Sequence, residues 1–133
     1  MTGSRDRNKQ IGRNLEAILE AANDLLFAVG VPATGADLAA IDRKTQLAFC
    51  ECIRRVGEAV AQIDAVDAAW LTTQFPDIAW AAAKSTRNRL THRYWTLDYQ
   101  ILHDIAVLHL PAMTAPIATH LDLPDPYQPV DPG

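Results

Sequence analysis

Residues 87–94, Arg-Asn-Arg-Leu-Thr-His-Arg-Tyr, gather more side chains capable of chemistry than any other stretch of the chain. An arginine such as Arg87 binds a phosphate through two parallel N–H donors and offsets the negative charge that builds up in a transition state. A histidine such as His92 titrates near neutrality, so it can take a proton from a ribose 2′-hydroxyl or protonate a leaving oxygen. Tyr94 can stack on a nucleotide or hydrogen-bond to it. The chemistry that suits this set is metal-independent cleavage of an RNA phosphodiester.

The spacing limits how these groups can meet. On one helix Asn88 and His92 share a face, so the amide can orient the imidazole. Arg87 and His92 are five residues apart, which is about 140° around the axis, so a straight helix does not aim both at one small target. Either the helix ends near Thr91, or two chains complete each other's site. From the residue types alone, a structural helix end with solvated charges remains the alternative to a nuclease site.

Apolar periodicity predicts the helices that would hold this stretch. An amphipathic helix is expected over residues 9–29 and a second from Thr34, its N-cap, to about Ile63. A third would follow Asp77 as cap and run through Trp80 into residues 87–94, and a fourth would follow Thr96, with Pro111 bending or interrupting it. The inner face expected for the second helix carries Leu38, Ile41, Thr45, Ala48, Cys52, Val56, Ala59, Val60 and Ile63.

The predicted fold is therefore all-α, an antiparallel up-and-down four-helix bundle. It occupies residues 9–120, and residues 121–133 form a Pro-rich tail that is expected to be extended or disordered. Residues 1–8 are expected to be loose, and the cations near the N-terminus are interpreted as a solvated helix end.

Composition excludes several classes of protein. The chain has 133 residues and a formal charge of -4, which argues against a broad nucleic-acid-binding face. Its apolar runs are too short to span a bilayer.

Cys50 and Cys52 lie two apart in a predicted helix and cannot easily bridge or share a metal, so we interpret them as reduced packing residues. Reduced thiols without a signal peptide favour the cytoplasm. Neither a cofactor nor a metal is expected. His103, His109 and His120 have no ligand spacing and should face solvent or cap helices.

Over residues 11–120 the chain resembles HEPN domains, specifically the HepT-like branch of toxins that are paired with minimal nucleotidyltransferases. The motif of that branch, an Arg, four residues, a His, one residue and a Tyr, is met by Arg87, His92 and Tyr94, with Asn88 in its usual place. Residues 56–59 and 75–80 resemble the second-helix signature of the branch and the start of its third helix, and Asp98 and Leu110-Pro111 also fit. Arg93 departs from the pattern, because the branch often has Gly there.

The resemblance implies a four-helix bundle that forms a homodimer, with the two motifs facing each other across a shared cleft. Arg87 and His92 would be the catalytic pair of a metal-independent endoribonuclease toxin in a type VII-like toxin–antitoxin system. Asn88, Arg89, Arg93 and Tyr94 would bind or orient the RNA. A cognate minimal nucleotidyltransferase antitoxin would attach AMP to Tyr94 and block the cleft. The alternative is a non-catalytic HEPN module that binds a nucleotidyltransferase or nucleotides.

Overall fold

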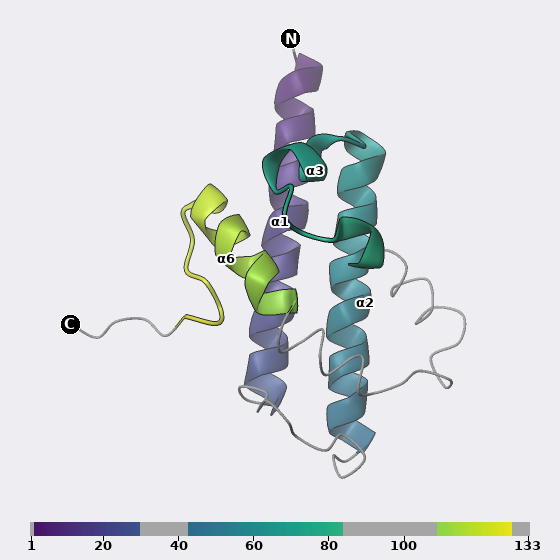
Figure 1. The fold of residues 1–133 in the computed structure, drawn as a ribbon, viewed down its shortest axis with the longest axis vertical. Coiled ribbons are helices and arrows are strands. Elements are labelled where there is room, and N and C mark those ends of the chain that lie inside the picture. Colours follow the sequence, from purple (N-terminus) through teal and green to yellow (C-terminus); the bar gives the residue numbers. More distant parts are fainter. Residues whose placement is uncertain (1, 30–42, 84–108, 129–133) are drawn as a thin grey trace, which may run out of the picture.

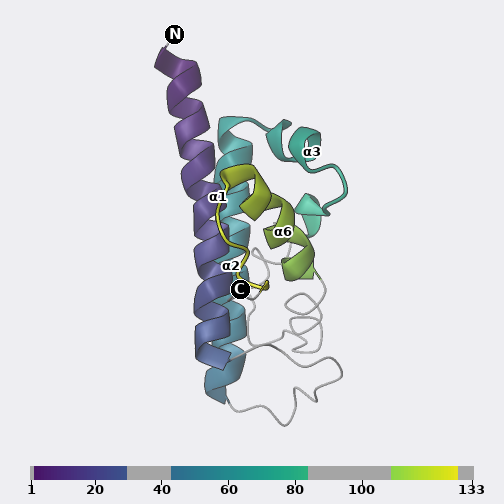
Figure 2. The ribbon, with the colours of Figure 1, turned by 90° about the vertical axis from the view of Figure 1, so that its left-hand side faces the viewer.

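A computed structural model describes residues 2–29, 43–83 and 109–128. Four helices lie wholly within these ranges: α1 (Thr2–Val29), α2 (Arg43–Val66), α3 (Trp70–Gln74) and α6 (Leu110–Leu121). Residues 80–83 form a further helical turn. The helices α1 and α2 lie antiparallel and side by side along the long axis, and α3 and α6 pack on one side of this pair (Figures 1 and 2). The described ranges contain no strand, so the all-α class is confirmed there. The four-helix arrangement remains a prediction, because residues 84–108 lie outside the described part.

The core forms where the apolar stripes of α1 and α2 meet. The apolar positions of α1 that lie three and four residues apart are buried from Ile11 to Leu25, and Leu15, Ile18 and Ala22 among them are completely inaccessible to solvent. On α2 the predicted positions from Cys52 to Ile63 are buried, whereas Leu38 and Ile41 fall outside the described residues. The core of the described chain also includes Ile11, Leu19, Leu25, Phe49, Val56, Val60, Leu71, Trp80, Leu110, Met113 and Ile117. Helical periodicity therefore located the main interface correctly.

The first helix begins earlier than predicted. Residues 2–8 are helical rather than loose, although residues 5–10 are all exposed. Once a packed helix has formed, adding residues to its end costs little, because each further residue gains a backbone hydrogen bond. The polar start of α1 thus continues a helix that is nucleated by the buried stripe beginning at Ile11.

Two other helix boundaries also differ from expectation. The second helix runs to Val66, and Asp67 N donates to Ile63 O at 2.9 Å, which extends the helical hydrogen bonding beyond Ile63. The helix expected after Asp77 begins at Trp80, since residues 76–78 form a turn and a bend. The connection between them contains the short helix α3.

The last described helix, α6, begins at Leu110, and Pro111 lies in its first turn. The backbone N–H that proline lacks would have no intrahelical partner at that position. Met113 is buried, whereas Ala112 is exposed because α6 presents its other side to α1. Residues 96–108, where the fourth helix was predicted to begin, lie outside the described residues.

The extended or disordered tail that the sequence predicted is not confirmed over its described part, which ends at Gln128. Asp122 adopts a left-handed conformation (φ 56°, ψ 46°), and Leu123 N donates to Ala118 O at 2.9 Å, so α6 ends in a hydrogen-bonded cap. Beyond it, the buried Thr114 Oγ1 donates to Asp125 Oδ1 at 2.9 Å, and Tyr127 N donates to the same oxygen at 3.0 Å. Local prolines predicted an irregular segment, but contacts with α6 hold it in a defined turn.

Candidate functional site

The predicted site itself, residues 87–94, lies outside the described residues. The positions of Arg87, Asn88, Arg89, His92, Arg93 and Tyr94 therefore remain sequence predictions, and so do the two geometries that could bring Arg87 and His92 together. The described structure reaches Ala83, four residues before Arg87. It shows how the fold fixes the segment that leads into the motif.

That segment is anchored by Trp80. Its side chain is only 4 % exposed, and its Nε1 donates to Phe75 O at 3.1 Å. Phe75 N donates to Leu71 O at 2.8 Å, so the same short stretch is also tied to α3. A buried indole held at both its ring and its N–H has little freedom to rotate. The helical turn that starts at Trp80, seven residues before Arg87, therefore begins from a fixed point.

An aromatic cluster surrounds this anchor. The Phe75 ring lies 6.1 Å from the ring of Trp80 and 5.9 Å, edge-on, from that of Trp70. The imidazole of His120, from the last turn of α6, makes edge contacts with Trp70 at 5.4 Å and with Phe75 at 5.8 Å. His120 is exposed, as predicted, but its ring also joins α6 to the segment before the motif. Spacing along the sequence gave no sign of this contact.

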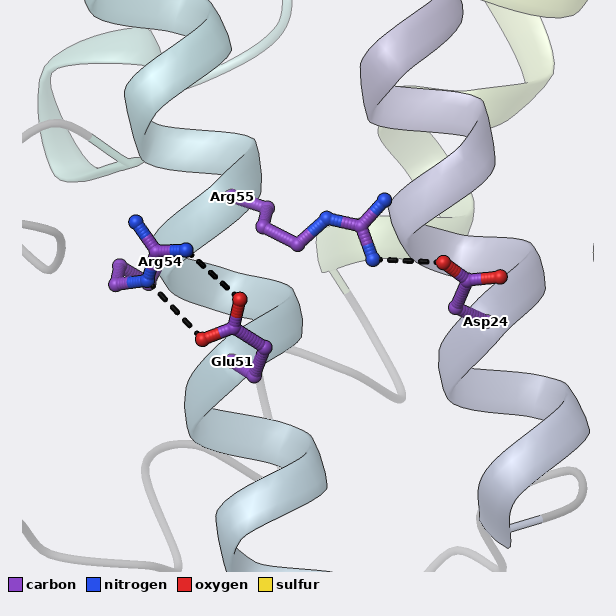
Figure 3. Close-up of polar contacts among 4 residues, drawn as sticks. All are labelled: Asp24, Glu51, Arg54 and Arg55. Carbon is purple, nitrogen blue, oxygen red and sulfur yellow. Dashed lines mark hydrogen bonds and ion pairs between the residues drawn. The ribbon is translucent and has the colours of Figure 1, made fainter.

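Charged residues of α2 form two ion pairs, one within the helix and one across to α1 (Figure 3). Arg54 and Glu51 pair within α2 at 2.7 Å, and the Arg54 hydrogen bond lowers the pKa of the Glu51 carboxyl. Arg55 Nη1 lies 2.7 Å from Asp24 Oδ2 and joins α2 to α1. Both pairs are largely exposed, Asp24 to 68 %, so each adds little stability. Helical periodicity could not show that Asp24 and Arg55 meet.

The cysteines behave as packing residues. Cys50 and Cys52 are free and buried, which confirms the prediction. Burial raises the pKa of both thiols, that of Cys52 to about 12, so neither ionises near neutral pH. In the described ranges no group of three or more His, Cys, Asp or Glu side chains could hold a metal ion. Nor is any helix in those ranges long and apolar enough to cross a membrane.

Comparison with known proteins identifies the class of this helical chain. The family model described as "Ribonuclease HepT-like" matches residues 31–119, well over half of the chain. The chain therefore belongs to the family of HepT-like ribonucleases, which confirms the resemblance seen in the motif.

A relative from Methanocaldococcus jannaschii, named "Putative RNase MJ0127", is 26 % identical over 98 residues. The match covers 74 % of this chain and 70 % of the relative. No solved structure matches the chain.

Proposed function

We propose that this chain is a metal-independent endoribonuclease in which Arg87 and His92 cleave RNA through the ribose 2′-hydroxyl. The observation that carries the proposal is that the family match over residues 31–119 includes the whole motif from Arg87 to Tyr94. Because the family is one of ribonucleases, its match supports a catalytic role for Arg87, His92 and Tyr94 over a merely structural helix end.

The proposed step balances without a metal or a cofactor. The 2′-oxygen bonds to the adjacent phosphorus and the bond from phosphorus to the 5′-oxygen breaks, which leaves a 2′,3′-cyclic phosphate and a 5′-hydroxyl. One proton leaves the 2′-hydroxyl and one is added to the departing oxygen, and His92 serves this transfer. Arg87 neutralises charge on the non-bridging phosphate oxygens. Asn88, Arg89, Arg93 and Tyr94 would bind or orient the RNA.

A homodimer fits this chemistry better than a single chain does. Arg87 and His92 diverge by about 140° on a straight helix, so a second copy facing the first would bring two arginines and two histidines to one cleft. One imidazole could then act as the base while the other acts as the acid. We propose this two-chain site as the active form.

Activity of purified protein tests the catalytic assignment. Wild type should cleave a single-stranded RNA in the presence of EDTA and spare an otherwise identical oligonucleotide with 2′-deoxyriboses. His92→Ala should reduce the rate by about 10²–10⁴-fold, the usual contribution of a proton-transfer residue. His109→Ala, which removes an exposed histidine just before α6, is the matched control and should retain activity. Equal activity of wild type and His92→Ala would refute the assignment.

Regulation by a partner is a second part of the proposal. A cognate minimal nucleotidyltransferase antitoxin would transfer AMP to the Tyr94 hydroxyl, which would place a phosphate beside Arg87 and fill the volume that RNA needs. Intact mass after co-expression should show the increment of an AMP group in wild type and none in Tyr94→Phe. Tyr127→Phe is the control: its phenol is half-buried, so this variant should still gain the AMP increment. An increment that persists in Tyr94→Phe would contradict this site.

The formal charge of -4 favours one alternative, a non-catalytic HEPN module that binds a nucleotidyltransferase or nucleotides. It predicts that no RNA is cleaved at any enzyme concentration, while the partner still binds. The RNA cleavage assay therefore separates the two functions.

A further inference from the structure

The cations at the start of α1 form one stripe. Arg5, Lys9 and Arg13 are each four residues apart on a continuous helix, so they follow one another along one face. All three are exposed, and this face lies nearly opposite the buried stripe of Ile11 and Leu15. The sequence predicted that residues 1–8 are loose and that these cations belong to a solvated helix end. The helix instead turns these charges into an ordered row about 12 Å long.

Charge is separated sharply between this row and the rest of the chain. Residues 5–13 hold four cations and one carboxylate, whereas the remaining sequence holds eight cations and fifteen acidic residues. The start of α1 also extends beyond the neighbouring ends of α2 and α3, which leaves it open to a large ligand (Figure 2). A protein that is acidic overall therefore presents a projecting basic helix.

We infer that the stripe of Arg5, Lys9 and Arg13 is an accessory surface that binds the phosphate backbone of single-stranded RNA. Neighbouring cations on it are separated by about 6 Å along the axis, close to the separation of successive phosphates on an extended strand. Three such contacts add affinity without reading bases, because they involve only the backbone. The inference rests on the proposed function for the identity of the nucleic acid.

A second copy of the chain is the competing occupant. Further along the same face, Glu16 and Glu20 replace the cations, so two α1 helices could in principle pair antiparallel. However, these carboxylates line a groove whose other wall is the segment after α6, with Leu123, Pro124 and Pro126. A helix approaching Glu16 and Glu20 would meet this wall, whereas Arg5 and Lys9 are exposed and no described residue outside α1 is among the lining of a groove at that end. The arrangement therefore favours RNA over a second copy.

The test measures RNA binding in a background that cannot cleave. Full-length protein carrying His92→Ala is titrated into a fluorescent single-stranded RNA of about 20 nucleotides at several salt concentrations. Replacing Arg5, Lys9 and Arg13 by Gln should make the log–log salt slope shallower by about 2, since each single-strand contact contributes about 0.7. At about 0.1 M salt this corresponds to roughly 100-fold weaker binding.

A matched control removes the same charge elsewhere. Arg43, Lys44 and Arg54 are exposed cations on α2, and their replacement by Gln should change the slope much less. Equal effects of the two triple variants, or no effect of either, would overturn the inference. So would sedimentation showing that the α1 variant has lost a dimer that the control keeps, since that outcome assigns the stripe to a second copy. Weak binding by the α1 variant, with normal binding by the control, supports the stripe even if wild type cleaves no RNA.

Discussion

Replacing Thr114 by Val should loosen the C-terminal turn and leave α6 intact. Thr114 is completely buried, its Oγ1 donates to Asp125 Oδ1 at 2.9 Å, and Pro111 O lies 3.3 Å away. Valine has nearly the same shape but supplies no donor. The substitution therefore removes one hydrogen bond to a carboxylate and leaves the packing of α6 on α1 nearly unchanged.

The size of the effect follows from the surroundings of Asp125. A hydrogen bond to a charged group contributes about 1.5–3 kcal/mol. Asp125 is half-buried, so water can partly replace the lost donor and the lower end of this range applies. We expect a loss of about 1.5 kcal/mol in the free energy of unfolding, or a fall in Tm of about 5 °C for a chain of this length.

Chemical denaturation followed by far-UV circular dichroism measures this loss. Thr119→Val on the same helix is the matched control, because Thr119 Oγ1 donates to Ala115 O at 3.1 Å in an exposed position. It should change stability by less than about 0.5 kcal/mol. Asp125→Ala should cost more than Thr114→Val, since Asp125 Oδ1 also accepts from Tyr127 N, and the double variant should be no worse than Asp125→Ala. If Thr114→Val and Thr119→Val destabilise equally, the turn is not held by this bond.

Three further predictions concern the anchor, the aromatic cluster and the buried thiol. Trp80→Phe should lower the free energy of unfolding by about 2–3 kcal/mol in urea denaturation, because it removes the hydrogen bond to Phe75 O and leaves a cavity in the core. Trp70→Phe is the control and should cost less, since the Trp70 side chain is only half-buried. His120→Ala should cost about 1 kcal/mol in the same assay through its two edge contacts, and a cost equal to that of His109→Ala would contradict the contacts. Above about pH 9 the Cys52 thiol ionises in the unfolded chain but not in the folded one, whose pKa is about 12. Stability should therefore fall relative to Cys52→Ala by about 1.4 kcal/mol per pH unit up to about 12, and parallel pH curves would show that Cys52 is not desolvated.

The sequence predicted the features that depend on local pattern. The steps of three and four from Ile11 to Leu25 located the buried face of α1, and those from Cys52 to Ile63 located that of α2. The motif of Arg87, His92 and Tyr94 named the family, because the order of residue types along the chain carries that information by itself. The roles of those residues are still predictions.

The tertiary structure decided what depends on distant segments meeting. Propensity suggested a loose start and an irregular tail, but packing of Ile11 and the residues after it extends α1 to Thr2, and Thr114 holds Asp125 in a turn. The contact of His120 with Trp70 joins residues 50 positions apart, and no local pattern encodes such a distance. Periodicity determines which face of a helix is buried, whereas the partner of that face is chosen only when the helices pack together.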